Sequence, residues 1–180
     1  MHRRSLLGLL ILGACAAPER VRETPAVSLP SDVSCVPFAR ALSGIALSGD
    51  AHLWWSAAEG RYGRGREPVP GGVLVIGRTR ALPQGHLAVV VGRVGPREIL
   101  VTHANWGSGR ERGRVMENQR VVDVSRRNDW TSVRVWHPPT NTLGVTVYQA
   151  NGFILPPQAV DPARLAALVP TAAWAAAGTL

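Results

Sequence analysis

The sequence predicts an α+β domain in which N-terminal helices pack on an antiparallel β-sheet of about five to six strands. Two observations lead to this class. From residue 35 to residue 45, apolar side chains recur at the spacing of a helix with one buried face, namely Cys35, Phe38, Leu42 and Ile45. From residue 68 onward, β-branched runs alternate with Gly and Pro, as in strands joined by turns, and these runs cover 71–77, 86–94, 97–106, 119–125, 131–138 and 144–156.

The helical elements have recognisable ends. Asp32 or Ser34 can cap the first helix, and Gly44 falls where the apolar period stops. A second, short helix is expected around Trp54 to Glu59, before Gly-rich chain. The run at 86–94 is apolar on both faces, so we expect it at the centre of the sheet with the helix covering one side.

The N-terminus has the anatomy of an export signal. Arg3 and Arg4 precede a short apolar stretch that is too short to span a bilayer. The four residues at 12–15, Leu-Gly-Ala-Cys, resemble the lipobox of bacterial lipoproteins, in which Cys15 would carry the lipid. An ordinary signal peptide cleaved near Ala14 is the alternative. Because Ala16 rather than Asp follows the cysteine, the resemblance implies a lipid anchor at the periplasmic face of the outer membrane.

The charge balance narrows the possible partners. The chain has 180 residues and a formal net charge of +8, and all 20 of its basic residues are arginine. A basic surface favours anionic partners such as cell-wall polymers or lipid headgroups. No basic helix, zinc ligand set or aromatic nucleic-acid motif accompanies the arginines, so we expect no nucleic-acid partner.

Cys35 is a candidate nucleophile. If Cys15 carries lipid, Cys35 has no disulfide partner in a compartment where cysteines are normally paired. At a helix N-terminus, free N–H groups and the helix dipole lower the pKa of a thiol. The backbone N–H of Cys35 could also donate to an oxyanion. The alternative is a small residue buried in the core.

A thiol hydrolase also needs a histidine and a polar group that orients it. His86 begins the central strand, and His103 and Asn105 lie two apart, on one face of the next strand. If Gly95 and Pro96 form a two-residue hairpin loop, His86 faces Asn105 and lies diagonal to His103. A longer loop or a bulge would bring His103 directly opposite. The sequence leaves open which of the two orients His86.

Ordered blocks of the sequence carry a resemblance to a known family. The blocks are 35–40, Trp55, 70–75, 85–90 and 105–107. Together they resemble a CHAP domain, a cysteine, histidine-dependent amidohydrolase/peptidase related to the NlpC/P60 group within the papain-like superfamily. The resemblance implies a papain-like, NlpC/P60-like fold, with Cys35 as nucleophile and His86 as base. The family commonly has an acidic residue where His103 stands, whereas NlpC/P60 relatives use a histidine and papain-type enzymes an asparagine.

The resemblance implies peptidoglycan as substrate. The enzyme would be an N-acetylmuramoyl-L-alanine amidase or a stem-peptide endopeptidase, held at the membrane by the N-terminal lipid. An activator protein is a candidate partner. Two alternatives stay open, namely a non-catalytic wall-binding or scaffolding lipoprotein on a degenerate CHAP scaffold, and an acyl- or peptidyl-transferase. Trp55 and Trp106 are candidate substrate-binding residues, with core packing as their other explanation.

No cofactor or metal is expected, because the acids form no Ca²⁺ loop and the histidines outside the site lack ligand spacing. We therefore divide the chain into a signal peptide (1–14), a lipidated N-terminus and tether (15–33), a CHAP-like catalytic domain (34–157) and an Ala-rich C-terminal tail (158–180). The tail is predicted either as a loose helix or as disordered chain.

Overall fold

The computed structural model describes residues 32–178, apart from the side chain of Trp174. Helices and strands alternate with short turns, and the predicted α+β class is confirmed. In chain order the elements are α1 (Cys35–Ser43), η1 (Ala51–Leu53), α2 (Trp54–Ala57), β1 (Arg64–Gly65), β2 (Val73–Ile76), β3 (His86–Gly95), β4 (Glu98–Ala104), η2 (Gly109–Glu111), β5 (Val115–Asp123), β6 (Ser132–His137), η3 (Pro138–Thr140), β7 (Thr142–Leu143), β8 (Tyr148–Ile154) and α3 (Pro162–Ala177).

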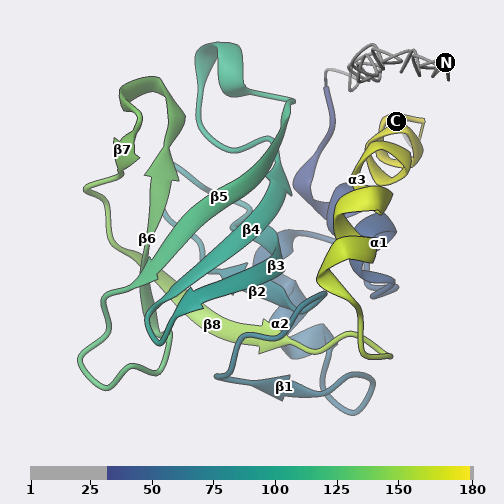
Figure 1. Ribbon diagram of the computed structural model, residues 1–180, viewed down its shortest axis with the longest axis horizontal. Helices are drawn as coiled ribbons and strands as arrows, with labels where there is room; N and C mark the ends of the chain where they lie inside the picture. Colours follow the sequence, from purple (N-terminus) through teal and green to yellow (C-terminus); the bar gives the residue numbers. More distant parts are fainter. Residues whose placement is uncertain (1–31, 179–180) are drawn as a thin grey trace, which may run out of the picture.

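The strands form one antiparallel sheet that curls on itself. In the described residues the strand order is β1-β8-β2-β3-β4-β5-β6-β7, and an additional pairing joins β8 to β6. This pairing closes β8, β2, β3, β4, β5 and β6 into a small barrel (Figure 1). The sequence predicted these six strands but not the closure, nor the two-residue strands β1 and β7. Closure leaves no edge in the ring, and it creates an interior as well as an outer face.

Each face of the barrel wall has its own core. All six ring strands contribute to the interior, because alternate side chains of a strand point to the same face. The interior is filled by buried residues that include Leu74, Ile76, Ala88, Val90, Ile99, Val101, Val121, Trp130, Val133, Val135 and Phe153. The outer face of β2 and β3 carries Val73, Val75, Leu87, Val89 and Val91. Strand β3 is therefore buried on both sides, as its unbroken apolar run predicted.

Helix α1 covers the outer face of β3. Its buried side includes Phe38 and Leu42, at the spacing that predicted the helix. Ser34 is its N-cap residue but makes no side-chain cap hydrogen bond, and the left-handed Gly44 ends it by donating its N–H to the carbonyl of Arg40. The helix therefore begins with Cys35, which is only partly buried and stands at the edge of this core.

The C-terminal residues 162–177 form helix α3, which lies beside α1 (Figure 1). Its inner side belongs to the same core as α1 and β3 and consists of Leu165, Val169, Ala172, Ala173 and Ala176. The alanines let the two helices approach closely, because a methyl group is the smallest side chain that still fills space. Of the two states expected for this segment, the structure has a helix, and it is packed rather than loose.

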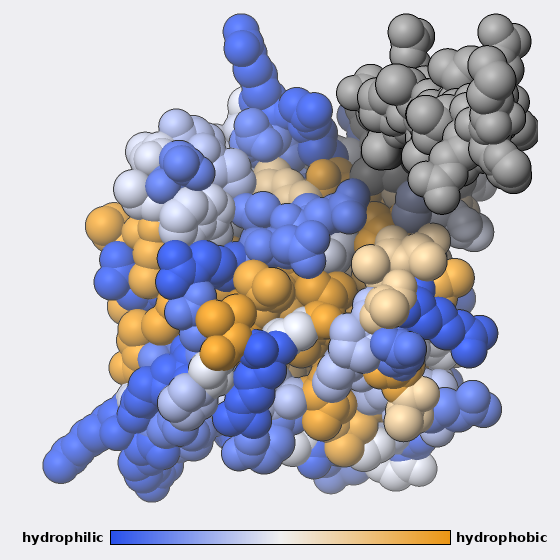
Figure 2. Space-filling view, in the orientation of Figure 1, coloured by the Kyte–Doolittle hydropathy of each residue, from blue (hydrophilic) through white to orange (hydrophobic). Residues whose placement is uncertain are grey.

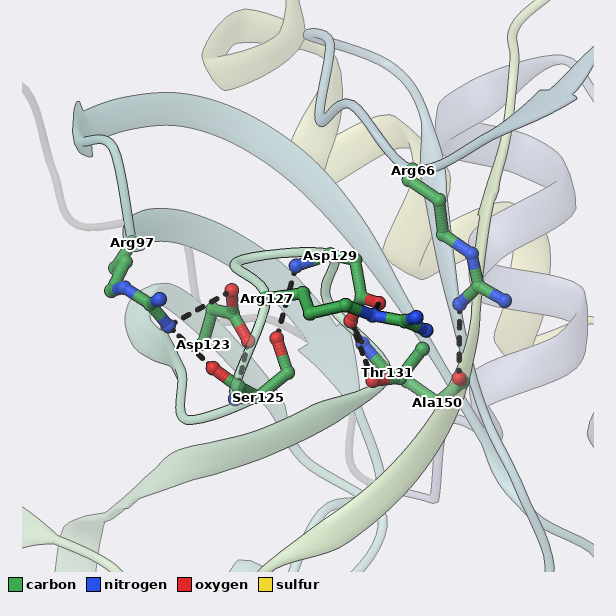
Figure 3. Close-up of polar contacts among 8 residues, drawn as sticks. All are labelled: Arg66, Arg97, Asp123, Ser125, Arg127, Asp129, Thr131 and Ala150. Carbon is green, nitrogen blue, oxygen red and sulfur yellow. Dashed lines mark hydrogen bonds and ion pairs between the residues drawn. The ribbon is translucent and has the colours of Figure 1, made fainter.

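Polar contacts hold together the barrel end at which the β3–β4 turn lies. Arg97, in this turn, donates to the carbonyl of Ser125 and approaches the buried carboxylate of Asp123 (Figure 3). Further along the β5–β6 connection, Asp129 accepts a hydrogen bond from the hydroxyl of Thr131 at 2.6 Å. The Arg97 contacts tie the two turns to each other, and the Asp129–Thr131 contact lies within the second of them. This end of the barrel is therefore held by side chains as well as by strand pairing.

Hydrophilic and hydrophobic residues are interspersed on the face of the molecule that Figure 2 shows, and several hydrophilic side chains project from it. Two exposed valines, Val145 and Val147, lie in the connection between β7 and β8. In residues 32–178, no helix combines the length and the apolar character that a membrane span requires.

The position of α3 in the core makes a testable prediction. Leu165 is fully buried, whereas Leu168 on the same helix is 36% exposed. We expect Leu165→Ala to lower the free energy of unfolding by about 2–5 kcal/mol, because it leaves a cavity. The matched change Leu168→Ala should cost about 1 kcal/mol or less. Urea denaturation of the full chain measures both, and equal small losses would mean that α3 is not part of the folded core.

Candidate active site

A cavity of about 660 Å³ lies where the N-terminus of α1 meets the start of β3 and the end of β4. We call it the cleft. It is lined by Ser34, Cys35, Val36, 49–51, 81–86, Asn105, 107–109 and Arg112. Three of the four predicted catalytic residues thus face one space, and the fourth, His103, lies behind His86. The elements that carry them are remote in sequence, so the cleft depends on the tertiary fold.

The register of β3 against β4 brings the histidines together. The hairpin loop consists of Pro96 and Arg97, with Gly95 opposite Glu98, one residue later than the loop expected from the sequence. Two irregularities follow along the ladder, and Val89 then pairs with Thr102. Counting on from that pair puts Ala88 opposite His103 and His86 diagonal to it, as the sequence argument placed them.

Cys35 presents a free thiol to the cleft. The backbone N–H groups of Leu87, Val36 and Cys35 itself face the sulfur and lower the pKa of the thiol, but burial has the larger effect and raises it above the ordinary value. The expectation that the helix N-terminus gives a low-pKa thiol therefore does not describe this structure. The resting site holds a neutral thiol beside N–H groups that can receive a negative charge.

His86 and His103 form a buried pair. The two rings lie nearly perpendicular, and Nε2 of His86 is 3.1 Å from Nδ1 of His103. Burial lowers the pKa of His103 to about 3, and burial together with the charge of His103 holds the pKa of His86 well below its usual range. Both imidazoles are therefore neutral near pH 7, which is the form in which His86 can accept a proton.

Either ring can be the donor in the hydrogen bond between Nε2 of His86 and Nδ1 of His103. When Nε2 of His86 donates to His103, the Nδ1 of His86 carries a lone pair and is free to act as a base. In the reverse arrangement, His86 carries its proton on Nδ1 and cannot accept another. Within the described residues the remaining nitrogen of His103, Nε2, is buried without a partner in either case. No fixed acceptor or donor on the far side therefore selects the tautomer.

Asn105 has a different partner from the one considered in the sequence. Its side-chain oxygen accepts the backbone N–H of Gly113 at 2.9 Å, and its backbone N–H donates to the carbonyl of Arg114. Its backbone is left-handed, with φ 59°, which asparagine tolerates better than most residues. Asn105 therefore shapes the loop that follows β4, and His103 is the residue in contact with His86.

The two tryptophans that were predicted to bind substrate, Trp55 and Trp106, lie in different places. Trp106 is 5% exposed and packs against both histidine rings, with centroid distances of 4.7 Å to His86 and 5.5 Å to His103. It supports the pair from behind and borders a second cavity beside β6 and β8. Trp55 is not part of the cleft lining. Arg64 and Arg66 lie over its ring instead.

A wall of the cleft that the sequence did not predict precedes β3. The backbone carbonyl of Gln84 accepts the backbone N–H of His52 at 2.9 Å. The ring nitrogen Nδ1 of His52 also lies within hydrogen-bond distance of this carbonyl. The next residue, Gly85, has φ 74°, and a Cβ there would come within 2.7 Å of the carbonyl oxygen of Ile76. The tight fit of Gly85 fixes where the chain enters β3 and hence where His86 lies.

Asp50 and Arg112 are the two charged residues of the cleft lining. Both lie in loops, for which apolar periodicity gives no signal. In the described residues, no group of three or more His, Cys, Asp or Glu side chains is arranged to hold a metal ion. The proposed lipidation site, Cys15, lies outside the described residues.

Comparison with known families gives one result for this chain. The family model of the CHAP domain matches residues 26–105, which include Cys35, His86, His103 and Asn105 and end just after β4. CHAP domains are generally those of peptidoglycan hydrolases and typically act as cysteine, histidine-dependent amidohydrolases or peptidases. No curated protein matches the chain.

The buried histidines predict how stability depends on pH. Each binds a proton in the unfolded chain below about pH 6.5 but stays neutral in the folded one, so stability is fully present above that pH and is lost as the pH falls. Each should contribute a slope of up to about 1.4 kcal/mol per pH unit. Urea denaturation between pH 7 and pH 5 should show a shallower slope for His103→Gln. His137→Gln, at an exposed histidine, serves as the control, and the prediction is wrong if both variants keep the wild-type slope.

Proposed function

We propose that this protein hydrolyses an amide bond of peptidoglycan through the thiol of Cys35, because residues 26–105 match the family model of the CHAP domain. The observation that carries the proposal is the cleft, in which a free thiol and a neutral histidine line one cavity and a second neutral histidine lies 3.1 Å behind the first. A papain-like, NlpC/P60-like architecture would agree with this order of nucleophile on a helix and base on a strand. The bond cleaved would be the amide between sugar and stem peptide or one within the peptide.

In the first step, the sulfur of Cys35 attacks the carbonyl carbon of the scissile amide. Since burial raises the pKa of the thiol and keeps His86 neutral, His86 takes the proton as the S–C bond forms, without a thiolate–imidazolium pair beforehand. The backbone N–H groups of Cys35 and Val36 are candidate donors to the oxyanion that develops. His86 then gives its proton to the leaving amine as the C–N bond breaks.

In the second step, water hydrolyses the thioester. His86 takes a proton from the water, the new C–O bond forms, and the C–S bond breaks to release a carboxylic acid. The sulfur recovers the proton from His86, so the enzyme returns to its starting state. Throughout, Nδ1 of His103 accepts the Nε2–H of His86, which holds the other nitrogen of His86 toward the cleft and stabilises the imidazolium.

Two features support a second candidate function, a non-catalytic wall-binding or scaffolding protein. The thiol has a raised rather than a lowered pKa, and Nε2 of His103 has no partner among the described residues. A degenerate site would tolerate both. The two candidates differ in one measurable respect, because only the hydrolase releases fragments from the wall.

We infer a lipid anchor at Cys15, which would hold the domain at the periplasmic face of the outer membrane and near peptidoglycan. The same position would favour control by an envelope protein, since an unregulated wall hydrolase would be harmful to the cell. Mass spectrometry of the mature N-terminus tests the anchor independently of activity.

The nucleophile is tested by matched substitutions at the two cysteines. Full-length protein incubated with purified sacculi should release soluble fragments whose masses identify the scissile bond. Cys35→Ala should reduce release by roughly a thousandfold or more, since the whole covalent route is lost. Cys15→Ala should leave it unchanged. Release by Cys35→Ala at the wild-type rate would exclude the mechanism, and absence of fragments from wild type with the fold intact by circular dichroism would favour the scaffold.

The orienting residue is tested by comparing His103 with Asn105. His103→Ala should lower kcat about a hundredfold, and His103→Gln, which keeps an acceptor, should recover part of the loss. Asn105→Ala should act mainly on KM, because its hydrogen bond shapes the loop at the cleft. The pH profile provides a second readout, since a purely structural effect would not change its shape. The opposite pattern, with kcat lost only in Asn105→Ala, would assign the orienting role to Asn105.

A further inference from the structure

The loop after β4, residues 107–114, forms part of the cleft and is fixed at its C-terminal end. Gly113 donates its N–H to the side chain of Asn105 and accepts the N–H of Val33 at its carbonyl, at 2.7 Å. Gly113 has φ 74°, and a Cβ there would come within 2.7 Å of the backbone of Asp32. These contacts hold the loop against the segment that leads directly into α1 and Cys35.

The loop carries several arginines, but only one of them lines the cleft. Arg112 belongs to the cleft lining, whereas Arg110 and Arg114 do not. Within residues 32–178, the Arg112 side chain makes neither an ion pair nor a hydrogen bond. Its neighbour Gly113 accepts the N–H of Val33, two residues before Cys35, so the backbone that carries Arg112 is held against the segment that leads into α1. The Arg112 guanidinium therefore has no protein partner in these residues, its backbone is held in place, and it is free to bind an anionic ligand.

We propose that Arg112 is a specificity-determining residue that binds a carboxylate of the substrate beside the scissile bond. This proposal rests on the proposed function. It assigns the cleft to peptide substrates that carry a free carboxylate on the part of the peptide next to the loop 107–114. A guanidinium offers a planar fork of N–H donors that matches a carboxylate. Asp50, the other charged residue of the lining, would repel the same group and so favours binding on the side of Arg112.

The charge recognition can be measured without assuming any activity. Iodoacetate and iodoacetamide both alkylate a thiolate with loss of iodide, but only iodoacetate carries a carboxylate. The ratio of their rates at Cys35, followed in the full chain by mass spectrometry of the peptide containing residue 35, reports the electrostatics of the cleft. A change in the pKa of the thiol alters both rates equally and cancels in the ratio.

At low ionic strength, Arg112→Gln should lower the iodoacetate-to-iodoacetamide ratio about two- to fivefold. Arg110→Gln removes the same charge from the same loop outside the lining and should leave the ratio near the wild-type value. Asp50→Asn should raise it. An unchanged ratio in Arg112→Gln would overturn the proposal, because Arg112 would then have no effect on the charged reagent. An equal fall in Arg110→Gln would also overturn it, because the effect would then come from the overall charge of the loop.

A second measurement uses paired substrates. Two stem peptides that differ only in a free carboxylate or a carboxamide should be cleaved by wild type with a KM about tenfold lower for the acid, as expected for a charge-assisted hydrogen bond. Arg112→Gln should lose this preference and Arg110→Gln should keep it. Equal preference in all three proteins overturns the assignment of Arg112. If no protein cleaves either peptide, cleavage within the stem peptide is excluded, while the alkylation ratio still decides whether Arg112 recognises a carboxylate.

Discussion

The site depends on the register of β3 against β4. These two strands carry His86 and His103, and a slip by one residue would turn either histidine to the opposite face of the barrel wall. In the observed register both side chains continue the inner row of their strands, at the end where Asn105 leaves β4. Pairing on both sides of β3, the closed barrel and the polar contacts at the far turns hold this register.

Burial is the second constraint on the chemistry. Enclosure by the barrel end and by Trp106 keeps both histidines neutral, and enclosure by α1 and β3 raises the pKa of the Cys35 thiol. The same desolvation that would provide His86 as a neutral base therefore makes the proposed nucleophile, Cys35, harder to ionise. A proton transfer coupled to the attack resolves this conflict, because no separated charges need to exist in the cleft before substrate fills it.

Local patterns predicted the elements well and their closure poorly. The apolar spacing of α1 and the run of β3 report burial directly. His103 lies near the end of β4, as expected, whereas Asn105 follows the strand and has a left-handed backbone. The hairpin turn was expected one residue too early, but two irregularities along the ladder restored the register at the histidines. Bulges leave little mark in a sequence, because they are decided by the pairing partner. For the same reason, neither the β6–β8 pairing nor the choice of His103 over Asn105 as the contact of His86 could be predicted.

The segment before α1 lies at the rim of the cleft. Asp32 and Val33 are held against Gly113 of the cleft loop, so the chain upstream departs from the rim of the cleft rather than from a remote face. If Cys15 carries a lipid as proposed, the chain between Cys15 and Asp32 spans at most about 60 Å even when fully extended. The anchor would then limit how far the cleft itself can travel from the membrane.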